Sequence, residues 1–442
     1  MSIYAVLDHD QTMYLFTGAR PEIMMHEIEE YFPNLQTIKL AINYRSDQSV
    51  INTGEKLIRY NYQPHGPYEE QYMKDVVPRS GAPEGLQFTL DTYPSAEDEA
   101  DGVADSIMAY LQPTEEDGIE IRNSPGSIFV GARTRAQLAY LEGPLMRRDV
   151  PFINITGGSF WESKHAMDVV AYVKLASDYN DGAAFARVYN IASAWMTMPW
   201  RKSPQYGEYC DHRFLGKEFL AQCKGSFINI HAASQARYSW QPGADDLNSF
   251  VAEIGFRDNP ADAVRFVLDE CYVRYLKSTE GLTTGDEAEN GKIEDLETVW
   301  AIARDFETIP EFLAYVDECI TTAKKAAGGD WGKLVVLSTV HRLKGLERDV
   351  VYGLGLGEGE RALKNGDIVP AGLLPHSFSL APPPQFGVLP SGGQGRIEDE
   401  RALCYVLVTR ARHLVHLSYP QTYRNCEFGP SRFLAEMGIE TE

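Results

Sequence analysis

The sequence predicts an α/β protein in which a parallel sheet is interrupted by a mostly helical insertion. Strand and helix patterns alternate from about residue 36 to 190, which is typical of a parallel sheet flanked by helices. Helical patterns with proline breaks then dominate, and strand patterns return at residue 334. We therefore expect three parts: a short N-terminal segment (1–35), a discontinuous sheet domain (36–190 and 326–442) and an inserted helical domain (191–325).

The first half of the chain contains most of the alternating strand and helix patterns. Ser95 is followed three residues later by Asp98, which resembles a capping box, and Val103 and Ile107 then continue at helical spacing. Besides this helix, the pattern predicts strands at 4–7, 37–42, 87–93 and 127–131, and helices at 21–31, 49–60, 134–147 and 165–177.

The second half closes the predicted sheet. Two helices end the insertion and a glycine-containing linker follows them. The predicted elements are helices 293–304 and 309–325, then strands 334–338, 350–354 and 414–419. A loop rich in proline and glycine, residues 357–395, is expected between the last two strands.

Composition limits the classes of protein. The 442 residues are 44% hydrophobic, enough for a sizeable core. The net charge of −22 argues against a nucleic-acid partner unless positive charge is concentrated locally. Acidic clusters such as 95–101 are expected to be solvated faces. There is no basic-then-apolar start and no apolar run of membrane-spanning length, so we expect no membrane association and a cytoplasmic location.

The six cysteines are scattered and form no CxxC pair, which favours free thiols in a reducing compartment. One cluster, Cys210, His212, Cys223 and His231, suggests a metal site on composition alone. Its spacing fits no standard zinc pattern, so we predict no metal ligands in this chain.

Residues 396–420 are the most informative stretch. An acidic start opens a helical pattern that places Leu403, Leu407 and Arg410 on one half-buried side, and an alternating strand follows at once. An arginine offers a rigid, permanently charged fork of donors that suits phosphate recognition. An arginine that closes a helix C-terminus explains the same residues equally well.

Three further stretches contain side chains that could bind a ligand or take part in catalysis. In residues 5–19, Gln11 stands at a strand end where it can position a phosphate or a water, and Tyr14 and Phe16 can stack on bases or serve as core. In residues 43–46, Tyr44 beside Arg45 can stack on adenine while the arginine reaches a phosphate.

In residues 335–359, a buried strand runs into Thr339, His341, Lys344 and Glu347 before a second strand begins. Polar groups at the carboxyl end of a parallel strand are where α/β proteins place ligands. An ordinary link between two strands is the alternative interpretation.

Taken together, the four stretches resemble, in order and wording, motifs III to VI of the UvrD/Rep-type superfamily 1 DNA helicases. Residues 5–19 resemble motif III, 43–46 motif IV, 335–359 motif V and 396–412 motif VI. The resemblance covers nearly the whole chain and is weakest at 195–270. It implies a RecA-like 2A domain interrupted by a helical 2B insertion, after the C-terminal end of a 1A-like lobe.

For the nucleotide, the resemblance implies specific roles. Gln11 would sense the γ-phosphate of ATP or its attacking water. Tyr44 would stack on adenine, and Glu347 would contact the nucleotide sugar. Arg45 and Arg410 would act as arginine fingers that stabilise charge on the transferring phosphate. The reaction implied is ATP hydrolysis coupled to translocation along single-stranded DNA in the 3′ to 5′ direction.

For DNA, the resemblance implies contacts from Tyr14, Phe16, Thr339 and His341 to single-stranded DNA. One departure weakens the match in the first motif, because the glycine that usually precedes its first aspartate is Leu7 here.

The phosphate loop GxxxxGK[ST] is absent from the 442 residues, and so is the acidic pair that would hold Mg²⁺ before motif III. We therefore expect a split helicase that needs a second polypeptide, or a missing segment, carrying the phosphate loop and the Mg²⁺-binding acid. A non-catalytic helicase remnant that binds DNA or a partner is the alternative, and a fragment of a longer protein is a third. A helicase–nuclease is not expected, since about twenty residues follow the last predicted strand.

Overall fold

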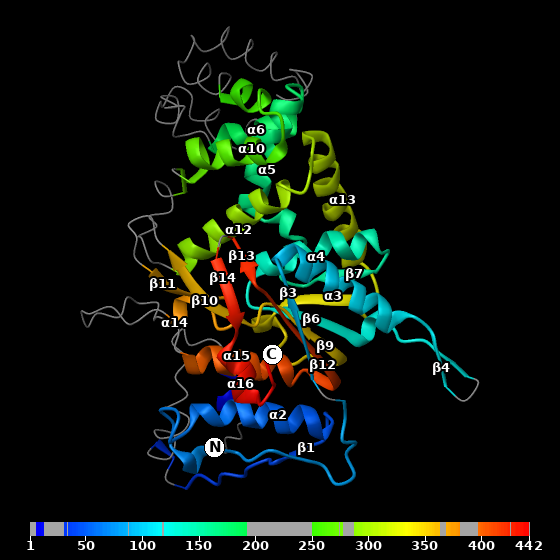
Figure 1. The fold of residues 1–442 in the computed structure, drawn as a ribbon, viewed down its shortest axis with the longest axis vertical. Coiled ribbons are helices and arrows are strands. Elements are labelled where there is room, and N and C mark those ends of the chain that lie inside the picture. Colours follow the sequence, from blue (N-terminus) through cyan, green and yellow to red (C-terminus); the bar gives the residue numbers. More distant parts are fainter. Residues whose placement is uncertain are drawn as a thin grey trace. The chain divides into compact units, whose positions relative to one another are not determined.

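The structure is a computed structural model (Figure 1). It describes residues 6–12, 31–32, 34–86, 88–116, 119–191, 250–273, 275–276, 287–362, 368–380, 397–424 and 426–441. Backbone contacts divide the chain into two compact units, Met1–Gly158 with Thr322–Glu442, and Ser159–Thr321. The predicted domain boundaries stay a prediction, since most of 191–249 lies outside the described residues.

The first unit is built on a six-stranded sheet in which every neighbouring pair is parallel. This confirms the predicted α/β class. The strand order across the sheet is β3 (Thr89–Tyr93), β12 (Ala411–Pro420), β9 (Arg348–Gly353), β6 (Ile128–Ala132), β8 (Val335–Thr339) and β7 (Phe152–Asn154).

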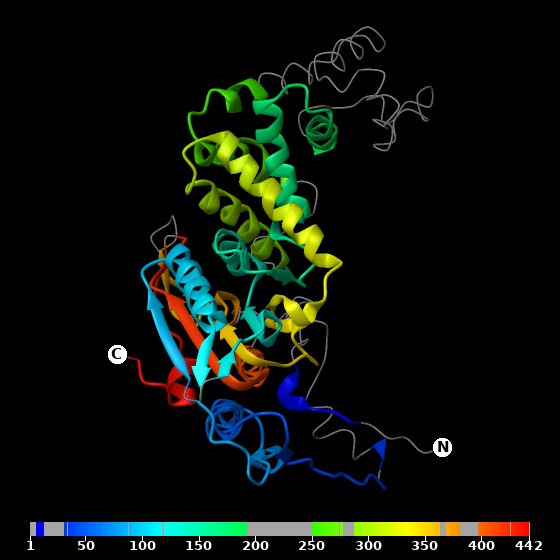
Figure 2. The same ribbon diagram turned by 90° about the vertical axis from the view of Figure 1, so that its right-hand side faces the viewer.

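Helices cover both faces of this sheet (Figures 1 and 2). On one face, α3 (Ala96–Leu111) packs against α4 (Arg135–Arg147); on the other, α15 (Ile397–Val408) packs against α2 (Gln48–Ile58). Both helices of the first pair begin at a cap. The Ser95 side chain accepts a hydrogen bond from the Asp98 backbone N–H, and Thr134 forms a capping box with Gln137.

Close packing of α15 on the sheet depends on two glycines. Gly131 of β6 and Gly353 of β9 are register partners. A Cβ atom at Gly131 would lie 2.3 Å from Leu407 Cδ1, and one at Gly353 would lie 3.0 Å from Leu407 Cδ2. The two glycines therefore let Leu407 pack directly on the sheet, which sets how close to the sheet the residues after α15 lie.

A second sheet corrects the prediction of a loop at 357–395. It has the order β11 (Ile368–Gly372), β10 (Gly357–Ala362), β14 (Cys426–Pro430) and β13 (Thr422–Tyr423), and all its pairs are antiparallel. The predicted strand 414–419 is therefore not the last one. The short helix α14 (Ser377–Leu380) follows β11, and residues 381–396 lie outside the description.

The N-terminal strand predictions are mostly wrong. Of residues 37–42, only Ile42 is in a strand. The strand β1 (Ile42–Asn43) pairs with β2 (Val77–Pro78), and the Val77 backbone N–H also donates to the Ala41 carbonyl over 2.8 Å, but residues 37–41 form no strand ladder with any described residue. Val6 and Leu7 of the predicted strand 4–7 are not in a strand, and its first two residues lie outside the description. The predicted helix 21–31 lies outside it as well, apart from Tyr31.

In the second unit, all of the regular secondary structure that the structure describes is helical. Its helices are α5 (Lys164–Ser177), α6 (Gly182–Ile191), α10 (Pro260–Val267) with the π-helix Leu268–Tyr272, α12 (Glu287–Ala303), and most of α13 (Ile309–Ala327). The cysteines and histidines of the rejected zinc cluster are outside the described residues. Among the described helices, none has the length and apolar character needed to span a membrane.

Candidate nucleotide and DNA site

The amino-terminal edge of the parallel sheet brings together residues from three distant parts of the chain. Glu347 precedes β9 and Arg410 precedes β12, and the Arg348 backbone N–H donates to the Arg410 carbonyl over 3.1 Å. The Ser46 hydroxyl donates to the Ala411 carbonyl over 2.6 Å, which brings the segment with Tyr44 and Arg45 to the same edge.

Arg410 lies in the turn after α15 and is fully buried, with 2% of its surface exposed. The prediction that it lies half-buried on the helix is therefore wrong. Its Nε donates to the Val406 carbonyl over 3.1 Å, and its two terminal nitrogens donate to the Leu346 carbonyl and to Gln11 Oε1, each over 3.3 Å. The fork is thus held in one orientation by backbone and side-chain acceptors.

The environment of Arg410 disfavours its positive charge. Burial, and then the nearby charge of Arg45, lower the pKa of Arg410 to about 10. The side chain still carries its proton at neutral pH. A buried cation without a full negative charge in contact is a strong attractor for an anion, because little water screens the interaction.

Arg45 and Arg412 flank Glu347. Arg45 Nε forms an ion pair with one oxygen of Glu347, and Arg412 donates to the other oxygen over 2.9 Å. The hydrogen bond from Arg412, followed by the charge of Arg45, holds the pKa of Glu347 below its usual value. Arg45 also donates to the Thr409 carbonyl over 3.4 Å, next to Arg410.

Tyr44 differs from its neighbours because 74% of its surface is exposed. Its ring therefore makes little contact with the protein as it stands. This exposure suits the predicted stacking on a planar base, since a ring with one free face has an open side for a ligand.

Gln11 reaches the same site from the N-terminal segment. It belongs to the short 3₁₀ turn η1 (His9–Gln11), and its backbone carbonyl accepts from Lys344 Nζ over 3.1 Å. Its side-chain nitrogen donates to Asp8 Oδ2 over 2.8 Å, while its side-chain oxygen faces Arg410. The structure thus brings together Gln11, Arg45, Glu347 and Arg410.

Two of the four predicted DNA-contacting residues, Thr339 and His341, lie at the opposite, carboxyl-terminal edge of the sheet. Thr339 ends β8, and His341 is in the 3₁₀ turn that follows. Burial, and then the charge of Arg133, lower the pKa of His341 to about 4, so the imidazole is neutral at physiological pH. Tyr14 and Phe16 lie outside the described residues.

A buried ion pair supports this edge. Arg133 follows β6, and its Nε donates to both oxygens of Glu400 over 3.0 Å. The same carboxylate accepts from the His376 backbone N–H over 3.0 Å. Burial raises the pKa of Glu400, but the charge and hydrogen bonds of Arg133 outweigh that effect and the net pKa is below its usual value.

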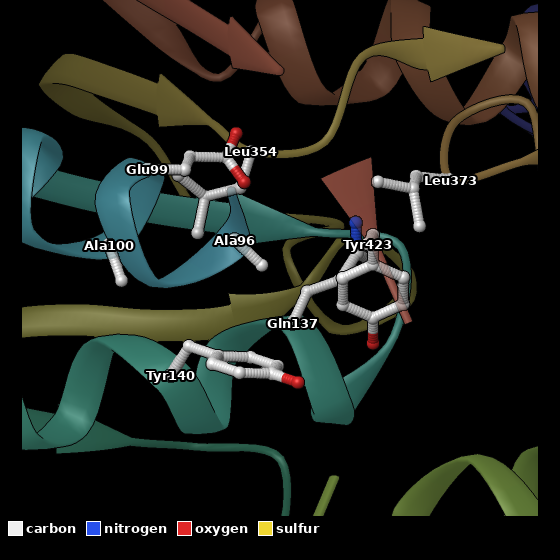
Figure 3. A pocket seen from close by; sticks show the side chains of 8 residues that line it. All are labelled: Ala96, Glu99, Ala100, Gln137, Tyr140, Leu354, Leu373 and Tyr423. Atoms are coloured by element: carbon white, nitrogen blue, oxygen red, sulfur yellow. The ribbon is translucent and has the colours of Figure 1, made fainter. Parts of the chain in front are cut away.

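Next to this edge, a small cavity opens where α3 and α4 begin (Figure 3). It is lined by Ala96, Glu99, Ala100, Gln137, Tyr140, Leu354, Leu373 and Tyr423. Glu99 is buried and accepts from the Gly355 backbone N–H over 3.0 Å and from the Ser418 hydroxyl over 2.6 Å. The expectation that acidic residues 95–101 form a solvated face therefore fails at Glu99.

Sequence reasoning missed two sets of residues around the nucleotide edge. Arg412 was not singled out, although its position two residues after Arg410 places it at the start of β12. Lys74 and Tyr62 were also missed, and both contact the segment that carries Gln11. No local pattern marks them, since they come from irregular segments after α2.

In the described parts of the chain, no three His, Cys, Asp or Glu side chains converge as ligands of a metal would.

Comparison with known proteins agrees with this arrangement. A family model described as the UvrD-like helicase C-terminal domain matches residues 38–209 and 239–422. The chain is 25% identical over 445 residues to a putative ATP-dependent DNA helicase, YjcD, of Bacillus subtilis, covering 98% of this chain and 50% of that protein.

Two further relatives give the same picture. DNA helicase II of Salmonella typhimurium is 26% identical, covering 99% of this chain and 55% of its own length. The ATP-dependent DNA helicase PcrA of Leuconostoc citreum is 24% identical, and the match covers 99% of this chain and 54% of that protein. The chain thus spans about half the length of the curated relatives it matches.

Proposed function

The chain belongs to the UvrD-like helicase C-terminal domain family, and we propose that its 442 residues supply the γ-phosphate-sensing part of an ATP-dependent DNA helicase. The observation that supports this proposal most is the convergence of Gln11, Arg45, Glu347 and Arg410 at one edge of the sheet. Gln11 and Arg45 lie more than 300 positions before Glu347 and Arg410 in the sequence, and each of the four residues has the chemistry that its predicted role requires.

In this proposal, Arg410 and Arg45 stabilise negative charge on the γ-phosphate as it transfers to water. Preorganised donors aimed at developing charge are the main source of catalysis in phosphoryl transfer. Arg410 is already fixed by the Val406 and Leu346 carbonyls, so little reorganisation is needed there. The Arg410 contact to Gln11 is the one that a phosphate oxygen would compete for.

Glu347 and Tyr44 would hold the rest of the nucleotide. The Glu347 carboxylate is ionised and positioned by two arginines, which leaves it able to accept a hydrogen bond from a sugar hydroxyl. Tyr44 offers an exposed ring for the adenine. Arg45 then links the two functions, because it contacts Glu347 and lies beside Arg410.

Single-stranded DNA would pass the opposite edge of the sheet, at Thr339 and His341. A neutral His341 can donate or accept one hydrogen bond without adding charge. The overall charge of −22 means that the positive charge needed for phosphate contacts must be local. Arg342, which is exposed and follows His341, provides such charge at this edge.

The phosphate loop and Mg²⁺ would come from residues outside these 442, either on a second polypeptide or on another segment of a longer protein. ATP would bind between that part and the Arg410 edge and close the two parts, and hydrolysis would open them again. Translocation in the 3′ to 5′ direction follows from the family and belongs to this proposal.

A co-purification and an ATPase assay test the proposal. The tagged chain is purified with any stoichiometric partner, and ATP turnover with and without single-stranded DNA is compared with that of the 442 residues alone. We expect DNA-stimulated turnover only when a phosphate-loop polypeptide is present. Turnover by the chain alone would contradict the need for a second part, and no turnover or nucleotide binding in any mixture would favour a non-catalytic remnant.

A matched pair of variants assigns the activity to this edge. Arg45→Gln removes a proposed finger, whereas Arg432→Gln removes an arginine whose ion pair with Glu358 lies on the small antiparallel sheet. Only the first substitution should lower turnover.

A further inference from the structure

The segment that carries Gln11 is anchored by a buried cluster of charged and polar side chains. Lys74 Nζ contacts both Asp8 and Asp10, lying 2.8 Å from Asp10 Oδ2. The Asp10 side chain is only 3% exposed and that of Lys74 only 18%. One ammonium group thus sits between two carboxylates that are two residues apart.

Tyr62 and His9 complete the cluster. The Tyr62 hydroxyl donates to Asp10 Oδ1 over 2.7 Å and lies 2.6 Å from His9 Nε2. A phenol has one proton to donate, so His9 Nε2 must be the donor in the second contact. Burial, the largest influence, lowers the pKa of His9 and keeps the ring neutral near pH 7. The two negative charges in the cluster therefore depend on Lys74 for neutralisation.

The cluster determines how Gln11 is oriented. Its side-chain nitrogen donates to Asp8 Oδ2 over 2.8 Å, which leaves the amide oxygen directed at Arg410. If Asp8 were displaced, its carboxylate would no longer hold the Gln11 side-chain nitrogen on its side of the amide. If the Gln11 side-chain amide rotated by 180°, its NH₂ group would face the Arg410 guanidinium, so that two hydrogen-bond donors would face each other.

We propose that Lys74 is a positioning residue for ATP hydrolysis, which acts through Asp8 to fix which atom of Gln11 faces Arg410. The inference rests on the proposed function for its catalytic consequence. The effect of Lys74 on the orientation of Gln11 is inferred only from the contacts between Lys74, Asp8 and Gln11. Lys74 touches neither Arg410 nor the expected phosphate position, so its effect on hydrolysis is indirect.

The properties of Lys74 agree with this role. Burial lowers the pKa of Lys74, but the charges of Asp10 and Asp8 more than compensate, and the net pKa lies above its usual value. Lys74 therefore keeps its positive charge at neutral pH. Replacing it with an uncharged side chain would leave Asp10 buried beside Asp8 without a cation, a costly arrangement.

A first experiment measures hydrogen exchange of the backbone amides in the 442-residue chain alone. The N–H groups of Asp10, Gln11 and Thr12 all donate within the segment. Lys74→Met should speed their exchange by at least about tenfold, since it removes charge-assisted hydrogen bonds. Lys74→Arg should restore protection. Unchanged exchange in Lys74→Met would overturn the proposal, whether or not the chain hydrolyses ATP.

Lys39→Met is the matched control. Lys39 Nζ donates to the carbonyls of Gln71 and Met73, so it holds the same loop without touching a carboxylate. This variant should leave the exchange of residues 10–12 unchanged. Equal acceleration in both lysine variants would mean that the loop, and not the carboxylate contact, protects the segment, and would also overturn the proposal.

A second experiment measures ATP turnover in the complex that contains the phosphate-loop part. Lys74→Met should lower kcat by about tenfold or more at unchanged KM, and Lys74→Arg should rescue it. If Lys74→Met unfolds the lobe, seen as fast exchange in β9, Asp8→Ala replaces it and should lower kcat alone. A raised KM with unchanged kcat would overturn the proposal. If the unsubstituted complex does not hydrolyse ATP, the proposed function fails while the exchange result still decides the positioning.

Discussion

Glu99 allows a quantitative test of the electrostatics at the carboxyl-terminal edge of the sheet. Its side chain is buried, and its Oε1 atom holds together the residues that follow β9 and the end of β12 through Gly355 and Ser418. Burial raises the pKa of Glu99 from 4.5 to about 7, and the two hydrogen bonds offset that increase only in part. The proposed perturbation is Glu99→Gln, which keeps an acceptor oxygen and removes the ionisation.

The direction of the effect follows from the two pKa values. The folded protein binds the proton of Glu99 more tightly than the unfolded chain, because the folded-state pKa is higher. This contribution to the free energy of unfolding is complete near pH 4.5 and below, and is lost as the pH rises to about 7. The difference of about 2.5 between the pKa values corresponds to about 3 kcal/mol, of which about 2.5 kcal/mol is lost between pH 5 and pH 8.

Urea unfolding at pH 5 and pH 8 measures this loss directly. The unsubstituted chain should lose about 2.5 kcal/mol more stability over this range than Glu99→Gln. Glu97→Gln, in the first turn of the same helix but only partly buried, is the control and should behave like the unsubstituted chain. If Glu99→Gln loses as much stability between pH 5 and pH 8 as the unsubstituted chain, the buried carboxyl is not the origin of the pH dependence and the reasoning is refuted.

Three further predictions concern the two edges of the sheet. Arg410→Lys should lower ATP turnover by about 10³-fold in the complemented enzyme, because a lysine cannot reproduce the fork; DNA binding, followed by fluorescence anisotropy, should persist. Glu400→Gln should destabilise the chain by about 3 kcal/mol in urea, since it removes the buried negative charge with which Arg133 forms its ion pair. As the control for Glu400→Gln, Asp75→Asn, which breaks an exposed ion pair with Arg59, should cost less than about 1 kcal/mol. His341 is neutral above about pH 5, so its contribution to DNA affinity, measured as the difference from His341→Gln, should not change between pH 6 and pH 8.

The parallel sheet and most of its helices could be predicted because their signals are local. The predicted strand 127–131 is β6, one residue later, and the predicted helix 134–147 is α4 with Thr134 as its cap. Buried strands and capped amphipathic helices depend on residues within one short window. The predicted domain boundaries and site roles, by contrast, depend on tertiary contacts and stay predictions.

The failures occur where pairing is non-local. Residues 357–362 are rich in glycine and charge and were predicted to be a loop, yet they form β10 because β14 pairs with them from about 70 residues away. Residues 37–41 have the alternation of a strand, but only the next two residues, Ile42–Asn43, form a strand ladder with a described segment. A pattern shows that a segment can be a strand, whereas the presence of a partner decides whether it is one.

Arg410 shows the same distinction inside the site. Its helical spacing predicted a half-buried residue on the helix, but α15 ends at Val408, because Ala411 pairs with Arg348 and starts β12. Thr409 fits the turn by donating its hydroxyl to the Tyr405 carbonyl over 2.7 Å. The arginine is consequently buried between a helix end and a strand start.

That burial makes the residues around Arg410 decisive for its chemistry. A fully buried guanidinium can face a phosphate only along the direction that its protein acceptors leave, and here that direction is occupied by the Gln11 amide oxygen. The orientation of Gln11 depends on Asp8, and the charge of Asp8 is balanced by Lys74. A motif comparison identifies Gln11 and Arg410, but the lysine that sets their mutual orientation has no sequence pattern and becomes visible only in the folded arrangement.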